Sequence, residues 1–126
     1  MRTIVLLMQC KPVAQRLMQN LRNTKNLRMI HEPNYANASA LARVHYACVA
    51  LIEIAESGEY NAAFCTALCH KLHRESPRCR LLLMCPEQNE ACIAQAVDGK
   101  QKGYVDDFVF CDCTIEYLTA KLLSLV

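Results

Sequence analysis

Cysteine is the residue type whose number and spacing most suggest chemistry, with nine thiols among 126 residues. Cys65, Cys69 and His73 recur at four-residue intervals, which would align them along one helical face where neighbouring side chains can hold a metal ion. The same segment contains Leu68 and Leu72 and matches no zinc-finger or zinc-ribbon spacing. We therefore interpret this face as part of a hydrophobic core.

Three further thiols stand at the carboxyl ends of apolar, strand-like runs. These are Cys10, Cys85 and Cys111, with Cys113 two residues beyond the last. Thiolates bind zinc and other thiophilic metals, and a thiol of lowered pKa can sense oxidants. Cysteine is also often buried as a small apolar group. We prefer simple packing, and we retain a metal-binding or redox site built from Cys10, Cys85, Cys111 and Cys113 as the alternative.

Short apolar runs alternate with helix-like segments along the whole sequence. The predicted strands are 3–8, 27–31, 47–54, 80–85 and 108–111. The predicted helices are 12–21, 34–45, 61–75, 87–97 and 115–125. No Gly/Ser-rich linker, charge block or low-complexity tract interrupts this alternation. The pattern predicts one domain that covers residues 1–126.

Five strands that alternate with helices indicate a parallel sheet with helices on both faces, because βαβ crossovers are right-handed. We expect a flavodoxin-like, doubly wound α/β fold with strand order 2-1-3-4-5. In such sheets the ligand site lies beyond the carboxyl ends of the strands, near the point where the strand order reverses. The predicted rim contains Gln9, Cys10, Glu53, Cys85 and Cys111.

One segment carries a family resemblance. Residues 103–109 read Gly-Tyr-Val-Asp-Asp-Phe-Val, which resembles the Gly-Ala-Asp-Asp-Tyr-Leu-Val run before the fifth strand of bacterial response-regulator receiver domains. Strand spacing and length extend this resemblance over almost the whole chain. In that family, two acidic residues after the first strand hold Mg²⁺ and an Asp at the end of the third strand accepts a phosphoryl group. A Thr or Ser ends the fourth strand, and a Lys-Pro pair ends the fifth.

The matching positions depart from this pattern. Gln9 and Cys10 stand in place of the metal-binding acids, Glu53 replaces the phosphoacceptor Asp, and Cys85 and Cys111 replace the Thr/Ser and the Lys. An amide beside a soft thiol is a poor Mg²⁺ site. Without Mg²⁺ and a cation, phosphoryl transfer lacks its main electrostatic stabilisation. We predict a pseudo-receiver without ordinary phosphorelay, and we hypothesise that the longer, charged Glu53 imitates a phosphorylated Asp.

The receiver resemblance also implies an interaction surface on the fourth helix, fifth strand and fifth helix. The residues predicted there are Ala91, Val97, Tyr104, Phe108, Tyr117 and Lys121. We expect this surface to bind a protein partner or a second copy of the chain. Asp106 and Asp107 are interpreted as a solvated turn and the start of a strand, not as metal ligands.

Composition and motifs argue against several other functions. A net charge of +2, with Lys and Arg scattered evenly, does not predict direct nucleic-acid binding. The apolar runs are far shorter than the roughly 20 residues of a membrane span, and the first residues do not form a signal peptide. We expect a cytoplasmic protein with reduced thiols. No Gly-rich phosphate loop or nucleophile–base motif is present, so we expect neither a cofactor nor catalysis. An enzyme of unknown reaction is the third hypothesis, after the pseudo-receiver and the thiol-based sensor.

Overall fold

A single parallel sheet of five strands, ordered β2-β1-β3-β4-β5, forms the centre of the computed structural model, which describes residues 1–126. The strands are β1 (Arg2–Leu7), β2 (Leu27–His31), β3 (Val49–Glu53), β4 (Arg80–Cys85) and β5 (Asp107–Phe110). The predicted flavodoxin-like fold and its strand order are confirmed. Strand order reverses between β1 and β3, so the carboxyl ends of these two strands define the predicted site.

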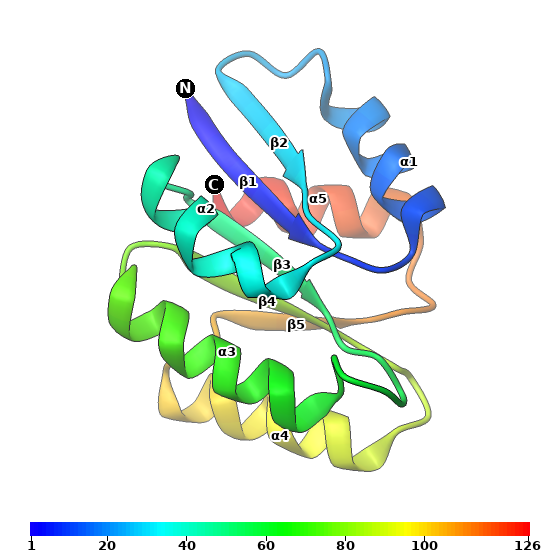
Figure 1. Cartoon of the computed structure of the whole chain (residues 1–126). Coiled ribbons are helices and arrows are strands. Elements are labelled where there is room, and N and C mark those ends of the chain that lie inside the picture. The colour runs from blue at the N-terminus through cyan, green and yellow to red at the C-terminus, as the bar shows by residue number, and fades with distance from the viewer.

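Helices cover both faces of the sheet. They are α1 (Lys11–Leu21), α2 (Ala38–Val44), α3 (Ala62–Glu75), α4 (Glu90–Lys102) and α5 (Ile115–Leu125). Helices α1 and α5 lie on one face, whereas α2, α3 and α4 lie on the other (Figure 1). The longest helix, α3, has 14 residues, and none of the helices has the length and hydrophobicity of a membrane span.

The central strand β3 shows why the core has two halves. Successive side chains of a strand point to opposite faces of the sheet. Ala50 and Ile52 accordingly pack beneath α2, α3 and α4, and Val49 and Leu51 pack beneath α1 and α5. Because both of its faces are covered, β3 is apolar from Val49 to Ile52, as expected for a central parallel strand, and only its last residue, Glu53, is charged.

The cysteines of α3 belong to the core. Cys65 and Cys69 are fully buried in the cluster under α2, α3 and α4, as predicted from their spacing with Leu68 and Leu72. His73, one turn further on, is exposed. This face of α3 therefore stabilises the domain and has no histidine turned inward beside its thiols.

Helix α4 differs from its prediction. It begins at Glu90 instead of Glu87, because the Asn89 side chain caps it by accepting the Cys92 N–H at 3.1 Å. It ends at Lys102 instead of Val97, because Gly103 takes the left-handed conformation with φ 88°. Its last turns are polar, so the apolar periodicity used for the prediction stops before the helix does.

The segment predicted as one helix over residues 34–45 is two elements. A 3₁₀ turn, η1 (Tyr35–Asn37), precedes α2. The Asn34 side chain accepts the Ala36 N–H at 3.1 Å and fixes the start of η1. This turn directs the Tyr35 ring into the core, where only 1% of the residue is exposed.

Candidate functional site

The carboxylate of Glu53 is bound by the loop that follows β1. Its Oε1 accepts the backbone N–H of Gln9 at 2.7 Å and that of Cys10 at 3.1 Å. The pairing of Leu7 with Ile52 brings this loop beside the end of β3. Cys10 is the N-cap residue of α1, so the carboxylate also lies at a helix N-terminus, where negative charge is favoured. We call this arrangement the Glu53 clasp.

Aromatic side chains hold the backbone of Glu53 from the other side. The Tyr35 hydroxyl donates to the Glu53 carbonyl oxygen at 2.6 Å, and its ring stacks on Tyr60 with centroids 3.9 Å apart. The Tyr60 hydroxyl accepts the Tyr35 N–H at 3.2 Å. Burial, followed by the nearby negative charge of Glu53, raises the pKa of Tyr35 strongly, so this hydroxyl remains a donor.

Tyr35 and Tyr60 were not predicted as site residues. Tyr35 lies within a segment predicted as a helix, and Tyr60 lies in a loop between elements. The only available signal was a large aromatic residue beside each predicted strand end, and such a residue is usually explained by packing alone.

The Gln9 side chain is occupied elsewhere. Its Nε2 donates to the Pro33 carbonyl oxygen at 2.6 Å, which ties the loop after β1 to the loop after β2. His31 adds a second link, since its Nε2 lies 2.9 Å from the Met8 carbonyl oxygen. Gln9 thus contributes its main-chain N–H to the Glu53 clasp and its side chain to the loop after β2.

Cys85 and Cys111 end adjacent strands on the other side of the rim. The Cys111 N–H donates to the Cys85 carbonyl oxygen at 2.8 Å. Burial raises the pKa of Cys85 to about 12. Burial, and then the nearby carboxylates of Glu53 and Glu87, raises the pKa of Cys111 to about 12 as well. Both groups are therefore thiols near neutral pH, whereas nucleophilic and metal-binding cysteines react as thiolates.

The rim cysteines do not form a ready-made metal site. Cys10, Cys111 and Cys113 are partly exposed and Cys85 is buried. Nowhere in residues 1–126 do three His, Cys, Asp or Glu side chains converge in an arrangement that could hold a metal ion. A structural zinc site needs four such ligands in a tetrahedron. The four rim thiols are therefore not arranged to bind a structural zinc ion.

Apolar side chains gather on the surface formed by α4, β5 and α5. Three of the seven exposed large hydrophobic residues lie there: Val97, Phe110 and Tyr117. Ala91, Val97 and Tyr117 of the predicted interaction residues are exposed, and Tyr104, Phe108 and Lys121 are partly buried. A hollow of about 420 Å³ between β5 and α5 is bordered by Phe108, Phe110 and Tyr117. We call this surface the α4–β5–α5 face.

Asp106 is exposed in the turn before β5 and Asp107 begins β5, as predicted, and both carboxylates also bind groups within the chain. The Asp107 carboxylate binds Lys100 of α4 at 3.1 Å and Lys121 of α5 at 2.8 Å. The Asp106 carboxylate accepts the Leu81 N–H at 2.8 Å and so fixes the start of β4. Both carboxylates are structural acceptors, and neither belongs to the rim.

The fold and the rim together define a receiver-like class. No protein-family model matches the sequence, and neither does any curated protein. Solved structures do match. A signal receiver domain of a response regulator from Bacteroides fragilis has a TM-score of 0.79 and 21% identity, over 99% of this chain and 96% of that one. A CheY-like protein, tadZ, from Pseudomonas aeruginosa has a TM-score of 0.74 and 19% identity over the full length of both chains.

A third similar structure comes from the streptococci. It is described as belonging to a family of redox sensors that evolved from two-component response regulators, and it matches with a TM-score of 0.77 and 15% identity. The match covers 99% of this chain and 51% of that protein. At these identities the comparisons establish the fold, which is that of response-regulator receiver domains, and function has to be argued from the residues.

Proposed function

We propose that this chain is a receiver-like signalling domain of the cytoplasm that acts by protein docking through the α4–β5–α5 face, without aspartyl phosphorylation. The observation that carries this proposal is the gathering of Val97, Phe110 and Tyr117 around β5. Strand β5 is an edge strand that pairs with β4 alone, so its outer backbone groups are open to a partner. Exposed apolar groups beside such an edge favour association.

The electrostatics of the α4–β5–α5 face support the same proposal. The single carboxylate of Asp107 binds both Lys100 and Lys121 within the chain, with the Asp107 and Lys121 side chains only 20% and 25% exposed. The hollow beside Phe110 and Tyr117 is lined mainly by apolar and aromatic side chains, with Asp112 as its one charged residue. Interface cores have this composition, since they are depleted in charged residues and enriched in aromatic ones.

The Glu53 clasp supports the absence of phosphorylation. A carboxylate that binds two backbone N–H groups fills the place beside the loop after β1. The residues Gln9 and Cys10 bring no carboxylate to this loop, and Mg²⁺ prefers oxygen ligands. In this proposal Glu53 holds the rim in one fixed conformation. Incubation with acetyl phosphate and Mg²⁺ should leave the intact mass unchanged, and a phosphoryl adduct on any rim residue would contradict this part.

Sedimentation equilibrium tests the docking surface. We expect the wild-type chain to dimerise, and Phe110→Asp to weaken the dimer at least tenfold by placing a charge in the apolar contact. Val44→Asp is the matched control, because Val44 is exposed on α2, away from this face. A monomeric wild-type chain, or equal weakening by both variants, would contradict self-association through the α4–β5–α5 face.

A thiol redox sensor is the second candidate function. Its support is the structural similarity to the streptococcal protein described as a redox sensor, together with the partly exposed Cys10 and Cys113 at the rim. The raised pKa of Cys111 and of Cys113 argues against a spontaneously reactive thiolate at those two positions. Titration of the native protein with hydrogen peroxide, followed by peptide mapping, tests this candidate. Selective oxidation of one rim cysteine at low peroxide would favour it over the docking proposal.

A further inference from the structure

The fold separates charges that are evenly mixed in the sequence. Eight of the twelve carboxylates lie at the rim, and Lys11 is the one lysine or arginine there. These carboxylates are Glu32, Glu53, Glu56, Glu59, Glu87, Glu90, Asp112 and Glu116. The opposite end of the sheet, where the strands begin, carries seven lysines or arginines without an ion-pair partner: Arg2, Arg22, Lys25, Arg43, Arg74, Arg78 and Arg80. The even scatter along the sequence is therefore misleading, because the molecule has an acidic end and a basic end.

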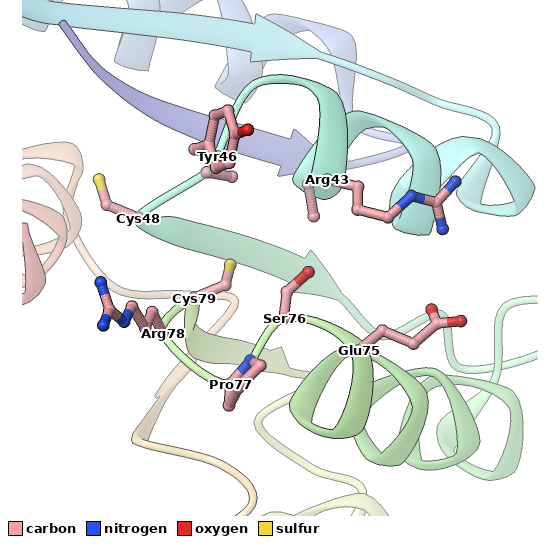
Figure 2. A pocket seen from close by; sticks show the side chains of 10 residues that line it. Arg43, Tyr46, Cys48, Glu75, Ser76, Pro77, Arg78 and Cys79 are labelled. Atoms are coloured by element: carbon pink, nitrogen blue, oxygen red, sulfur yellow. The ribbon is translucent and has the colours of Figure 1, made fainter.

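The basic end contains a hollow of about 510 Å³ between two turns. The turn from α2 to β3 carries Tyr46, the turn from α3 to β4 carries Arg78, and the two face each other across the hollow (Figure 2). Arg43 lines the hollow from α2. All three ion pairs of the chain are made by lysines, so Arg43 and Arg78 have no carboxylate partner. Glu75 is the one carboxylate that lines the same hollow, so its lining carries a net charge of +1. Unpaired guanidinium groups around a concave surface are suited to bind carboxylates.

The acidic end presents a loop of opposite charge. Residues 56–59, which read Glu-Ser-Gly-Glu, are all exposed between β3 and α3. A backbone hydrogen bond of 2.8 Å from the Ala55 N–H to the Tyr60 carbonyl oxygen closes the base of this loop. Gly58 at its tip takes φ 92°, a conformation that glycine adopts without strain. The loop therefore projects two carboxylates, Glu56 and Glu59, on a defined turn.

Helix dipoles explain only part of this arrangement. In a parallel α/β fold the helices begin at the rim, and carboxylates in a first turn, such as Glu90 and Glu116, stabilise the helix N-terminus. Glu56, Glu59 and Arg78 lie in turns between elements, beyond the helix ends themselves. Helix dipoles therefore do not account for the positions of these three residues at opposite ends of the molecule. A loop at one end and a hollow at the other suit a binding role.

We propose that the basic end of one copy binds the acidic end of a second copy, with the loop 56–59 seated in the hollow beside Arg43 and Arg78. The contact joins two different surfaces at opposite ends of the molecule, so it is heterologous and leaves one free surface of each kind. Association proceeds head to tail and can continue beyond a dimer. This contact is separate from the α4–β5–α5 face and does not depend on it.

Sedimentation velocity at low and high salt tests the proposal. We expect species larger than a dimer that grow with protein concentration at about 20 mM NaCl and disappear at about 300 mM, because salt screens contacts between exposed charges. Arg43→Gln with Arg78→Gln should weaken this growth at least tenfold, and so should Glu56→Gln with Glu59→Gln. All four residues are exposed, so these variants should fold, which circular dichroism verifies.

Mixing the two double variants gives the decisive measurement. Both double variants also carry Phe110→Asp, which removes dimerisation through the α4–β5–α5 face. The arginine variant keeps its loop and the glutamate variant keeps its hollow, so an equal mixture should form one contact and stop at a mixed dimer. Arg16→Gln with Lys71→Gln is the matched control, since it removes two exposed cations from α1 and α3, away from the hollow. A salt-insensitive wild-type chain, an unreactive mixture, or binding of heparin without self-association would overturn the proposal. Phe110→Asp leaves the salt-sensitive growth intact, so failure here is distinguishable from failure of the docking function.

Discussion

Glu53 Oε1 accepts the backbone N–H of Gln9 at 2.7 Å, so the last residue of β3 is tied to the loop that follows β1. The Cys10 N–H completes the contact at 3.1 Å. A carboxylate used in this way is a structural acceptor that fixes the relative position of two strand ends. In the hypothesis of a phosphate mimic, Glu53 holds the rim in this way without a bound phosphoryl group.

Removal of this carboxylate should destabilise the domain. In Glu53→Ala the Gln9 and Cys10 N–H groups lose their acceptor, and an unsatisfied, partly buried donor costs about 1–3 kcal/mol. Glu53→Gln should cost less, because its amide oxygen still accepts. Urea denaturation measures the free energy of unfolding of each variant, and hydrogen exchange at the two amides should speed up in Glu53→Ala. Equal stability of Glu53→Ala and the wild-type chain would show that the clasp contributes nothing.

The periodicity of apolar residues predicted the helices and strands of this chain, but it did not predict contacts between side chains of distant segments. Alternation of strands and helices predicted a doubly wound parallel sheet, and the flavodoxin-like order chosen for it is the observed one. The bounds 27–31, 80–85 and 115–125 were also predicted as observed. These elements have apolar patterns that begin and end sharply. The partners of Glu53 and Asp107 were not predictable, because they depend on where side chains from distant segments point. The spatial separation of charge was missed for the same reason.

Asp107 should make stability depend on pH. Burial alone would raise the pKa of this carboxyl, but hydrogen bonds from Lys121, the Phe108 N–H and Lys100 outweigh it and lower that pKa. A lowered folded-state pKa stabilises the native protein above the unfolded value of about 3.9, and the contribution is lost as pH falls through the folded-state pKa. Asp107→Asn should therefore cost about 1 kcal/mol at pH 7.

The matched measurement is urea denaturation of both proteins at pH 7 and near pH 3. The difference in free energy of unfolding should shrink at the lower pH, where the wild-type carboxylate becomes protonated. Lys102→Gln is the control, because its ion pair with Asp98 is more exposed, with side chains 67% and 48% accessible, and such pairs contribute little. A difference that stays constant with pH would mean that Asp107 acts through packing instead of charge.

The cysteines should react slowly in the native protein. Five of the nine, Cys65, Cys69, Cys79, Cys85 and Cys92, are buried. Burial raises the pKa of Cys65, Cys79 and Cys85 to about 12. Iodoacetamide at pH 7.5 should therefore modify at most the four partly exposed thiols, and all nine only after denaturation. Because the pKa of Cys111 is also about 12, its alkylation rate should rise about tenfold per pH unit from pH 8 to 10 without a plateau. A plateau near pH 8 would instead identify a reactive thiolate and favour the redox sensor.

Tyr46 occupies a backbone conformation that suits glycine. Its φ is 49°, and it lies in the turn that follows α2. In this turn the Tyr46 N–H donates to the Arg43 carbonyl oxygen at 3.4 Å, and the Ala47 N–H donates to the Ala42 carbonyl oxygen at 3.0 Å. This hydrogen-bond pattern ends many helices, with glycine as the usual residue in the left-handed position. The side chain is 89% exposed, so its ring gains little from packing in the monomer.

Tyr46→Gly should accordingly stabilise the domain. Relief of the left-handed strain gains about 1–2 kcal/mol, and the greater freedom of glycine in the unfolded chain offsets about 0.5–1 kcal/mol of it. Tyr46→Ala is the control, because it removes the same exposed ring and keeps the strain, so its stability should stay within about 0.5 kcal/mol of the wild-type value. Urea denaturation of the three proteins measures the difference. If Tyr46→Gly is no more stable than Tyr46→Ala, the strain of the positive φ at residue 46 is no larger than the cost of the greater freedom of glycine in the unfolded chain.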